Sequence, residues 1–111
     1  MDPDAVEAVL LAVEQIPPGK LASYGLIGEL VGLGPRQVGS IMANHGSAVA
    51  WWRVTSANGE LPAHLVAEAG IHWDAERITR KPNGRGADYR GHQVDPAQLA
   101  ADYQTALTAE G

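Results

Sequence analysis

Two breaks made of proline and glycine divide the first half of the 111-residue chain into short segments. The first break is Pro17-Pro18-Gly19, and the second runs from Gly32 to Pro35. Proline cannot continue a helix and glycine favours turns, so no helix is expected to cross either break. A chain of this length forms one domain around one core. We therefore expect that core to be built from short helices.

Apolar residues recur at helical spacing before the first break and near the end of the chain. The first helix can be capped by Asp2 or Asp4, with Pro3 in its first turn. The last helix is predicted over residues 96–108, and Asp95 is suited to cap it. The positions expected to face the core are Val6, Val9, Leu10, Val13 and Ile16 in the first helix, and Leu99, Tyr103 and Leu107 in the last.

A helix-turn-helix pair is predicted over about residues 24–44. Ser23 can cap a helix from Tyr24 to Val31, and Pro35 can begin the next helix, which ends near Asn44. Two short helices joined by a three-residue turn containing glycine match this motif. The motif alone is weak evidence for DNA binding, because small helical proteins often contain such pairs.

A pocket strand and a hairpin are predicted over about residues 49–61. Residues 49–55 read as a buried strand, Ser56-Ala57-Asn58-Gly59 as a hairpin turn, and Glu60 as the start of a return strand. The predicted fold class is therefore mainly α with a small β hairpin, in a single winged helix-turn-helix domain over residues 1–111, a class that includes many DNA-binding domains.

The segments after the hairpin carry weaker signals. Residues 62–69 are expected to form a short helix that ends at Gly70, and residues 71–73 a brief strand. Residues 77–91 are polar, basic and rich in glycine, which is typical of a mobile loop or of a hairpin with Asn83-Gly84 at its tip.

The distribution of charge permits a nucleic-acid partner despite a net charge of −5. All eight Lys and Arg residues lie between Lys20 and Arg90, where six acids leave a local charge of +2. Such a middle region is compatible with modest, salt-sensitive DNA binding. The N-terminus has acids where a signal peptide needs basic residues, and no apolar run approaches membrane-spanning length. We expect a cytoplasmic, nucleoid-associated protein with no membrane contact.

The absence of cysteine excludes disulfides, thiolate nucleophiles and cysteine-ligated zinc. The histidines have no metal-ligand spacing, so no metal site is expected; they are His45, His64, His72 and His92. We also expect no other cofactor.

Three stretches in order, IPPGKLASYG, PRQVGSIMANH and WWRV, resemble the C-terminal domain of the O6-alkylguanine-DNA alkyltransferases. The resemblance covers residues 4–61 well and residues 62–111 loosely. The family's active-site motif is Pro-Cys-His-Arg-Val, and the same positions here are Ala50-Trp51-Trp52-Arg53-Val54. Trp51 takes the place of the alkyl-accepting cysteine, as in the alkyltransferase-like proteins. Indole is no nucleophile at neutral pH, so the resemblance implies a binding protein with no catalytic residues.

The resemblance implies roles for residues of the helix-turn-helix in DNA binding. Tyr24 would press the phosphate beside the target nucleotide and rotate that nucleotide out of the stack, and Arg36 would fill the gap. Asn44 would hydrogen-bond the turn that follows its helix. The small residues that would let this helix approach the DNA backbone are Gly39, Ser40 and Ala43. Without the resemblance, Tyr24 reads as a residue covering the core, Arg36 as a solvated side chain and Asn44 as a helix cap.

The resemblance also implies a lesion pocket. Trp51 would form its wall and Trp52 would face the supporting network, while Arg53 would have a structural or phosphate-binding role. In alkyltransferase-like proteins an arginine often faces the alkylated oxygen. Candidates for that position here are His64, Arg77, Arg80 and Arg85.

These residues together predict a monomeric, non-enzymatic sensor. It would bind O6-alkylguanine in double-stranded DNA through the minor groove, flip the nucleotide and direct the lesion to nucleotide excision repair proteins. One alternative is a winged helix-turn-helix transcriptional or architectural protein without lesion specificity. Another is a lyase or glycosylase, which would need a catalytic group such as Lys20 or Lys81 at the pocket.

Overall fold

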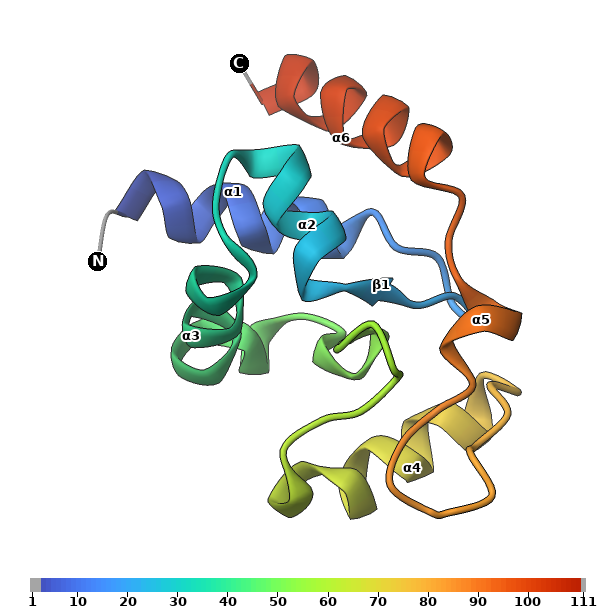
Figure 1. The fold of residues 1–111 in the computed structure, drawn as a ribbon. Coiled ribbons are helices and arrows are strands. Elements are labelled where there is room, and N and C mark those ends of the chain that lie inside the picture. Colours follow the sequence, from blue (N-terminus) through green and yellow to red (C-terminus); the bar gives the residue numbers. More distant parts are fainter. Residues whose placement is uncertain (1–2, 111) are drawn as a thin grey trace.

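The computed structural model describes residues 3–110, which form an elongated domain of 42 × 27 × 21 Å (Figure 1). Its α-helices are α1 (Pro3–Glu14), α2 (Tyr24–Val31), α3 (Pro35–His45), α4 (Val66–Ala75), α5 (Tyr89–His92) and α6 (Pro96–Glu110). Short 3₁₀ turns are η1 (Gly46–Ala48), η2 (Trp51–Arg53) and η3 (Ala63–Leu65). The strands are β1 (Ala22–Ser23) and β2 (Val54–Thr55). The predicted mainly helical class is confirmed.

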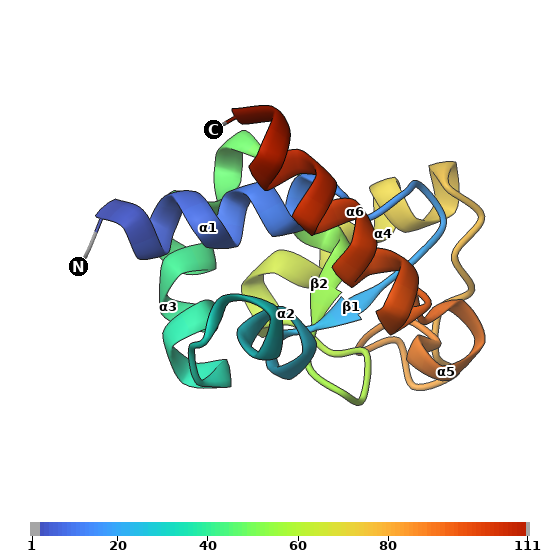
Figure 2. The same ribbon diagram turned by 90° about the horizontal axis from the view of Figure 1, so that it is seen from above.

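The main core lies between α1, α2, α3 and α6, with α6 lying across α1 at one end of the molecule (Figures 1 and 2). Val9, Val13 and Ile16 are buried as predicted, and Leu10 is half-buried. Leu107 differs from the prediction and is 39% exposed, because the last turns of α6 extend beyond the surface that they would cover. The proposed cap Asp2 lies outside the described residues.

The helix pair predicted over residues 24–44 is present as α2 and α3, which pack closely against each other. The Ser23 hydroxyl accepts a hydrogen bond from the Leu26 amide at 3.0 Å and so caps α2. Gly32 ends α2 in a left-handed conformation and donates its amide to the Gly28 carbonyl at 2.8 Å. The local signals of sequence therefore set both ends of this helix.

Substituting Ser23 with alanine is expected to lower the free energy of unfolding by about 1 kcal/mol, because the Leu26 amide loses its acceptor. Urea unfolding would measure the change. Ser40→Ala is the control, since Ser40 is exposed and its hydroxyl bonds none of the described residues. Equal unfolding midpoints for the two variants would contradict the capping role of Ser23.

The predicted strand and hairpin over residues 49–61 are wrong in detail. The β2 strand pairs in parallel with β1, in the register Ala22–Val54 and Ser23–Thr55 (Figure 2). Before it, residues 51–53 form the η2 turn, where the Arg53 amide donates to the Ala50 carbonyl at 3.1 Å. Local hydrogen bonds thus satisfy the backbone in place of a ladder.

The turn predicted at residues 56–59 is present, and the Gly59 amide donates to the Ser56 carbonyl at 2.9 Å. The segment that follows it does not return along β2. Glu60 instead forms an isolated antiparallel bridge with Gly86, because the distant 77–91 segment lies beside it. A partner 26 residues away cannot be read from local turn chemistry.

The segment over residues 62–73 also differs from the prediction. Helix α4 continues through Gly70 and includes residues 71–73, which were expected as a strand. Ala69 and Trp73 lie four residues apart on its buried face, so helical spacing decides the structure here. The 77–91 segment forms the hairpin that was one of its two predicted structures, through an Arg80–Ala87 bridge. Helix α5, which was not predicted, begins within this segment at Tyr89 and ends at His92.

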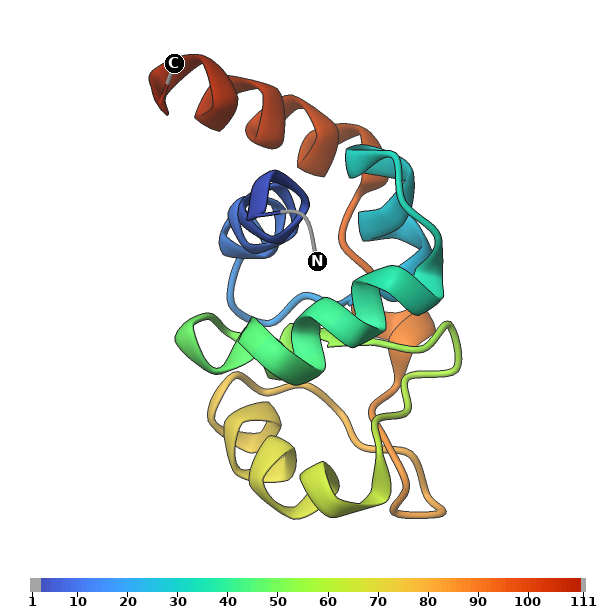
Figure 3. The same cartoon turned by 90° about the vertical axis from the view of Figure 1, so that its left-hand side faces the viewer.

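A second, smaller core lies at the end of the molecule away from α6, between α4 and the 77–91 segment (Figure 3). Its buried members are Leu21, Ala69, Trp73, Ile78 and Ala87, and the rings of Trp51 and Trp52 pack against it. Residues 51–55 therefore lie between the two cores.

Candidate nucleic-acid interface

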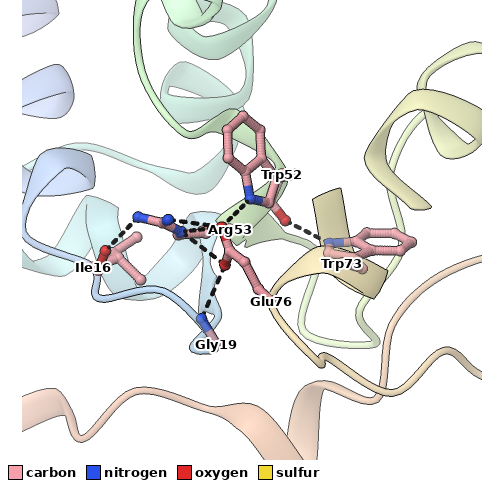
Figure 4. Close-up of polar contacts among 6 residues, drawn as sticks. All are labelled: Ile16, Gly19, Trp52, Arg53, Trp73 and Glu76. Atoms are coloured by element: carbon pink, nitrogen blue, oxygen red, sulfur yellow. Dashed lines mark hydrogen bonds and ion pairs between the residues drawn. The ribbon is translucent and has the colours of Figure 1, made fainter. Parts of the chain in front are cut away.

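A network of hydrogen bonds around Glu76 fixes the residues that follow α3 and η1 (Figure 4). The Arg53 guanidinium donates to both Glu76 carboxylate oxygens, the shortest contact being 2.7 Å from Nη2 to Oε2. Arg53 Nη1 also donates to the Ile16 carbonyl at 2.9 Å, and the Gly19 amide donates to Glu76 Oε1 at 2.9 Å. The Arg53 and Glu76 side chains are 15% and 12% exposed. This ion pair therefore ties η2 to the end of α1 and the end of α4.

The two adjacent tryptophans point to different surroundings. Trp52 Nε1 donates to Glu76 Oε2 at 2.8 Å, and its ring stacks on His72 with centroids 3.6 Å apart. Trp73 Nε1 donates to the Trp52 carbonyl at 2.8 Å. Trp51 packs edge-on against Trp52 and faces a surface cavity. Trp52 and Arg53 thus belong to the supporting network and Trp51 to the cavity.

Opposing effects act on the pKa of the Glu76 carboxyl. Burial by itself would raise its pKa, but hydrogen bonds from Arg53, Gly19 and Trp52 and the Arg53 charge together lower the pKa below its ordinary value. Glu76 is therefore ionised throughout the neutral range. Its charge holds the Gly19 amide and the side chains of the adjacent residues Trp52 and Arg53, which come from two separate parts of the chain.

A cavity of about 210 Å³ opens between α3, η2 and η3. Most of its lining is apolar. The lining residues are Tyr24, Gly39, Met42, Ala43, Gly46, Ser47, Trp51, Val54, Leu61, Pro62, His64 and Leu65. Burial raises the pKa of the Tyr24 phenol, so its hydroxyl stays neutral and can donate a hydrogen bond. A flat apolar wall with a few polar groups suits a planar aromatic ligand.

Helix α3 presents an exposed face of small side chains beside this cavity. Ser40 and Ala43 are exposed, and a Cβ added at Gly39 would meet no atom within 4 Å. Arg36 is exposed in the first turn, and none of the described residues is its hydrogen-bond or ion-pair partner. The resemblance implied that Asn44 would hydrogen-bond the turn after α3, but its side-chain amide instead donates to the Ser40 carbonyl within the helix, at 2.9 Å. A neighbouring polymer can therefore approach this helix face closely.

The four residues predicted as candidates to face the alkylated oxygen lie in different places; they are His64, Arg77, Arg80 and Arg85. Of these, only His64 is among the lining residues. Arg80 pairs with Asp74 at 2.7 Å, and its guanidinium lies against Gly70. Arg77 is exposed at the end of α4, and Arg85 lines a neighbouring groove that shares Leu61 with the cavity.

Nothing in the sequence marked Glu76, His72 or Trp73 as part of this site. The sequence contains thirteen acids, and nothing local marks Glu76 as the one that pairs with Arg53 across 23 positions. The only available signal was that a half-buried arginine needs an anionic partner.

Other classes of site can be checked against residues 3–110. Within this range no group of three or more His, Cys, Asp or Glu residues could hold a metal ion. No helix of the described chain is long and apolar enough to cross a membrane.

Comparison with solved structures identifies the fold. One similar structure is the crystal structure of S. pombe Atl1 in complex with damaged DNA containing O6-carboxymethylguanine. It has a TM-score of 0.73 and 22% identity, over 86% of this chain and 99% of that chain. A second is the structure of S. pombe ATL in complex with DNA, with a TM-score of 0.71 and 24% identity over the same shares. At these identities the likeness establishes the fold.

Comparison of the sequence with protein families identifies the family. The family model described as 6-O-methylguanine DNA methyltransferase, DNA binding domain, matches residues 4–80, which is more than half of the chain. No curated protein matches the sequence. The chain contains no cysteine, and alkyl transfer to a thiolate needs one. The chain therefore belongs to the 6-O-methylguanine DNA methyltransferase DNA-binding family, as an alkyltransferase-like member without an acceptor cysteine.

Proposed function

We propose that this protein is a non-enzymatic sensor that binds O6-alkylguanine lesions in duplex DNA. The observation that carries the proposal is the cavity walled by Trp51, directly beside the exposed small-residue face of α3. A flipped guanine and its alkyl group would stack against the apolar wall. The similar S. pombe Atl1 was crystallised with damaged DNA containing O6-carboxymethylguanine, which supports this class of ligand.

The proposed docking places α3 in the minor groove. Arg36 lies in the first turn and has no partner among residues 3–110, and it would enter the base stack at the gap that the flipped nucleotide leaves. Tyr24 lines the cavity and would press the adjoining phosphate toward rotation. Few base pairs can be distinguished from the minor groove. Binding would therefore depend on the lesion and little on the surrounding sequence.

The proposal excludes chemistry at the pocket. Trp51 occupies the place of the acceptor cysteine, and indole does not attack alkyl carbons. A lyase or glycosylase would need a catalytic lysine or acid at the cavity, and no Asp or Glu is among the described residues that line it. Of the two lysines, Lys81 bonds Glu60 at 3.0 Å and Lys20 is exposed elsewhere. Neither lines the cavity. We further propose that the bound monomer marks the lesion for nucleotide excision repair proteins and works in the cytoplasm at the nucleoid.

Arg36→Ala is expected to weaken binding to a duplex with one O6-methylguanine by about tenfold, because the gap in the stack loses its charge-assisted contact. Fluorescence anisotropy of a labelled duplex, beside its unmodified twin, would measure this. Arg90→Ala is the matched control: it removes the same charge from an exposed position on α5.

Trp51→Ala in the same titration should remove most of the preference for the lesion while leaving weak binding to both duplexes. If the unaltered protein binds both duplexes equally, the sensor proposal fails. A helix-turn-helix protein without lesion specificity would then remain, and a sequence preference would be sought among unmodified duplexes.

A further inference from the structure

We propose that His64 determines which alkyl substituents the cavity accepts. At neutral pH the site would select uncharged substituents, and it would admit an anionic substituent only when His64 carries a proton. This inference rests on the proposed function, because it concerns the substituent of a guanine bound in the same cavity.

The first observation concerns the charge of the residues that line the cavity. Among its described lining residues there is no Lys, Arg, Asp or Glu. A carboxylate that enters such a space loses its hydration and gains no cation in return, which is costly. A methyl or ethyl group loses no polar hydration and gains contact with the apolar wall.

The second observation is the position of His64. It lies in η3, whose turn is closed by the Leu65 amide donating to the Pro62 carbonyl at 2.9 Å. The His64 side chain is exposed at the rim, and no hydrogen bond joins its imidazole to the described residues. Its ring nitrogens are therefore free to bond a ligand.

What an imidazole offers to a ligand depends on its protonation state. A neutral imidazole offers one donor and one acceptor, whereas a protonated one offers two donors and a positive charge. Histidine is the side chain that commonly changes charge between about pH 5 and pH 8. A protonated imidazole at this position would add to the cavity the cation that a carboxylate substituent needs.

Other charged groups around His64 do not supply that cation at the cavity. Tyr24 is the other titratable lining residue, and it stays neutral because burial raises its pKa. Glu68 lies exposed one turn further along, on α4. Glu60 and Arg85 line the neighbouring groove beyond Leu61, and Glu60 pairs there with Lys81. Arg85 is the one free cation of that groove among the described residues, so it is tested beside His64.

The experiment measures the dissociation constants for three duplexes, carrying O6-methylguanine, O6-carboxymethylguanine or unmodified guanine, at about pH 5.5 and about pH 8. For the unaltered protein at the higher pH we expect binding to the methyl lesion to be at least about tenfold tighter than to the carboxymethyl lesion. At the lower pH we expect this ratio to fall by about tenfold, because histidine is more often protonated there and a protonated imidazole would attract the carboxylate.

Three variants complete the test. His64→Arg should bind the carboxymethyl lesion well at both pH values, and His64→Gln should keep the methyl preference at both. Arg85→Gln should leave the ratio and its pH dependence unchanged. The assignment of His64 is wrong if the ratio of the two dissociation constants is the same at both pH values and in both His64 variants. It is also wrong if the ratio changes in Arg85→Gln. Equal binding of all three duplexes instead overturns the sensor function itself.

Discussion

Replacing Glu76 with alanine is expected to lower the free energy of unfolding by about 3–5 kcal/mol. The carboxylate accepts hydrogen bonds from Gly19, Trp52 and Arg53, at distances of 2.7–3.2 Å. Without it, a guanidinium that is only 15% exposed keeps a single acceptor, the Ile16 carbonyl. Breaking one side of a buried ion pair is costly because the remaining charge stays desolvated. Urea unfolding would give the change in midpoint.

The matched control is Asp74→Ala, which breaks the other arginine–carboxylate pair of α4. That pair has the same closest distance, 2.7 Å, but its Arg80 and Asp74 side chains are 43% and 63% exposed. An exposed pair contributes about 0–1 kcal/mol, since water solvates each partner once the other is removed. Equal losses for the two variants would show that burial of the Glu76 network does not determine its contribution.

The pH dependence of unfolding gives a second measure of Glu76. Its folded pKa lies below the ordinary value, so its contribution to stability is complete above the pKa of an unfolded glutamate, about 4.3. The contribution is lost as the pH falls through the lower, folded pKa. The unaltered protein should therefore lose stability below about pH 4.3 more steeply than Glu76→Gln, in which this group cannot titrate.

Local signals in the sequence were sufficient for the helix pair. The Ser23 cap and the glycine–proline break fix the ends of α2 and the start of α3 within a few residues, and the structure has those ends where they were expected. The structure of residues 49–55, in which only Val54–Thr55 form a strand, could not be predicted in the same way. The pairing of that strand with residues 22–23 spans more than thirty positions, and alternation of apolar residues does not distinguish a strand from the η2 turn.

The site was predictable to a similar degree. A motif placed Trp51, and the structure brings it to one cavity with Tyr24 and His64. The supporting residues could not be found, because Glu76 and His72 meet η2 only through the packing of α4. The sequence offered four candidates to face the alkylated oxygen and gave no basis for choosing among them. The structure favours His64, because Arg77, Arg80 and Arg85 are not among the residues that line the cavity.

Gly59→Ala is expected to cost about 3 kcal/mol or more, because two separate penalties coincide there. The residue has a φ of +81°, which disfavours any side chain, and a Cβ would press into the Ala87 carbonyl, which belongs to the backbone and cannot rotate away. These two residues also hold the basic 77–91 segment against the 56–59 turn, because the Ala87 amide donates to the Gly59 carbonyl at 2.8 Å.

Gly84→Ala separates the two penalties. Gly84 has a similar φ of +72°, but a Cβ there would meet no atom within 4 Å, so only the backbone strain of about 1 kcal/mol is expected. Urea unfolding of both variants measures the difference, and amide exchange at Ala87 reports whether the 77–91 segment has come away from the 56–59 turn. If both variants lose the same stability, the turn has room to move, and the basic segment is held by Arg80 and Lys81 instead.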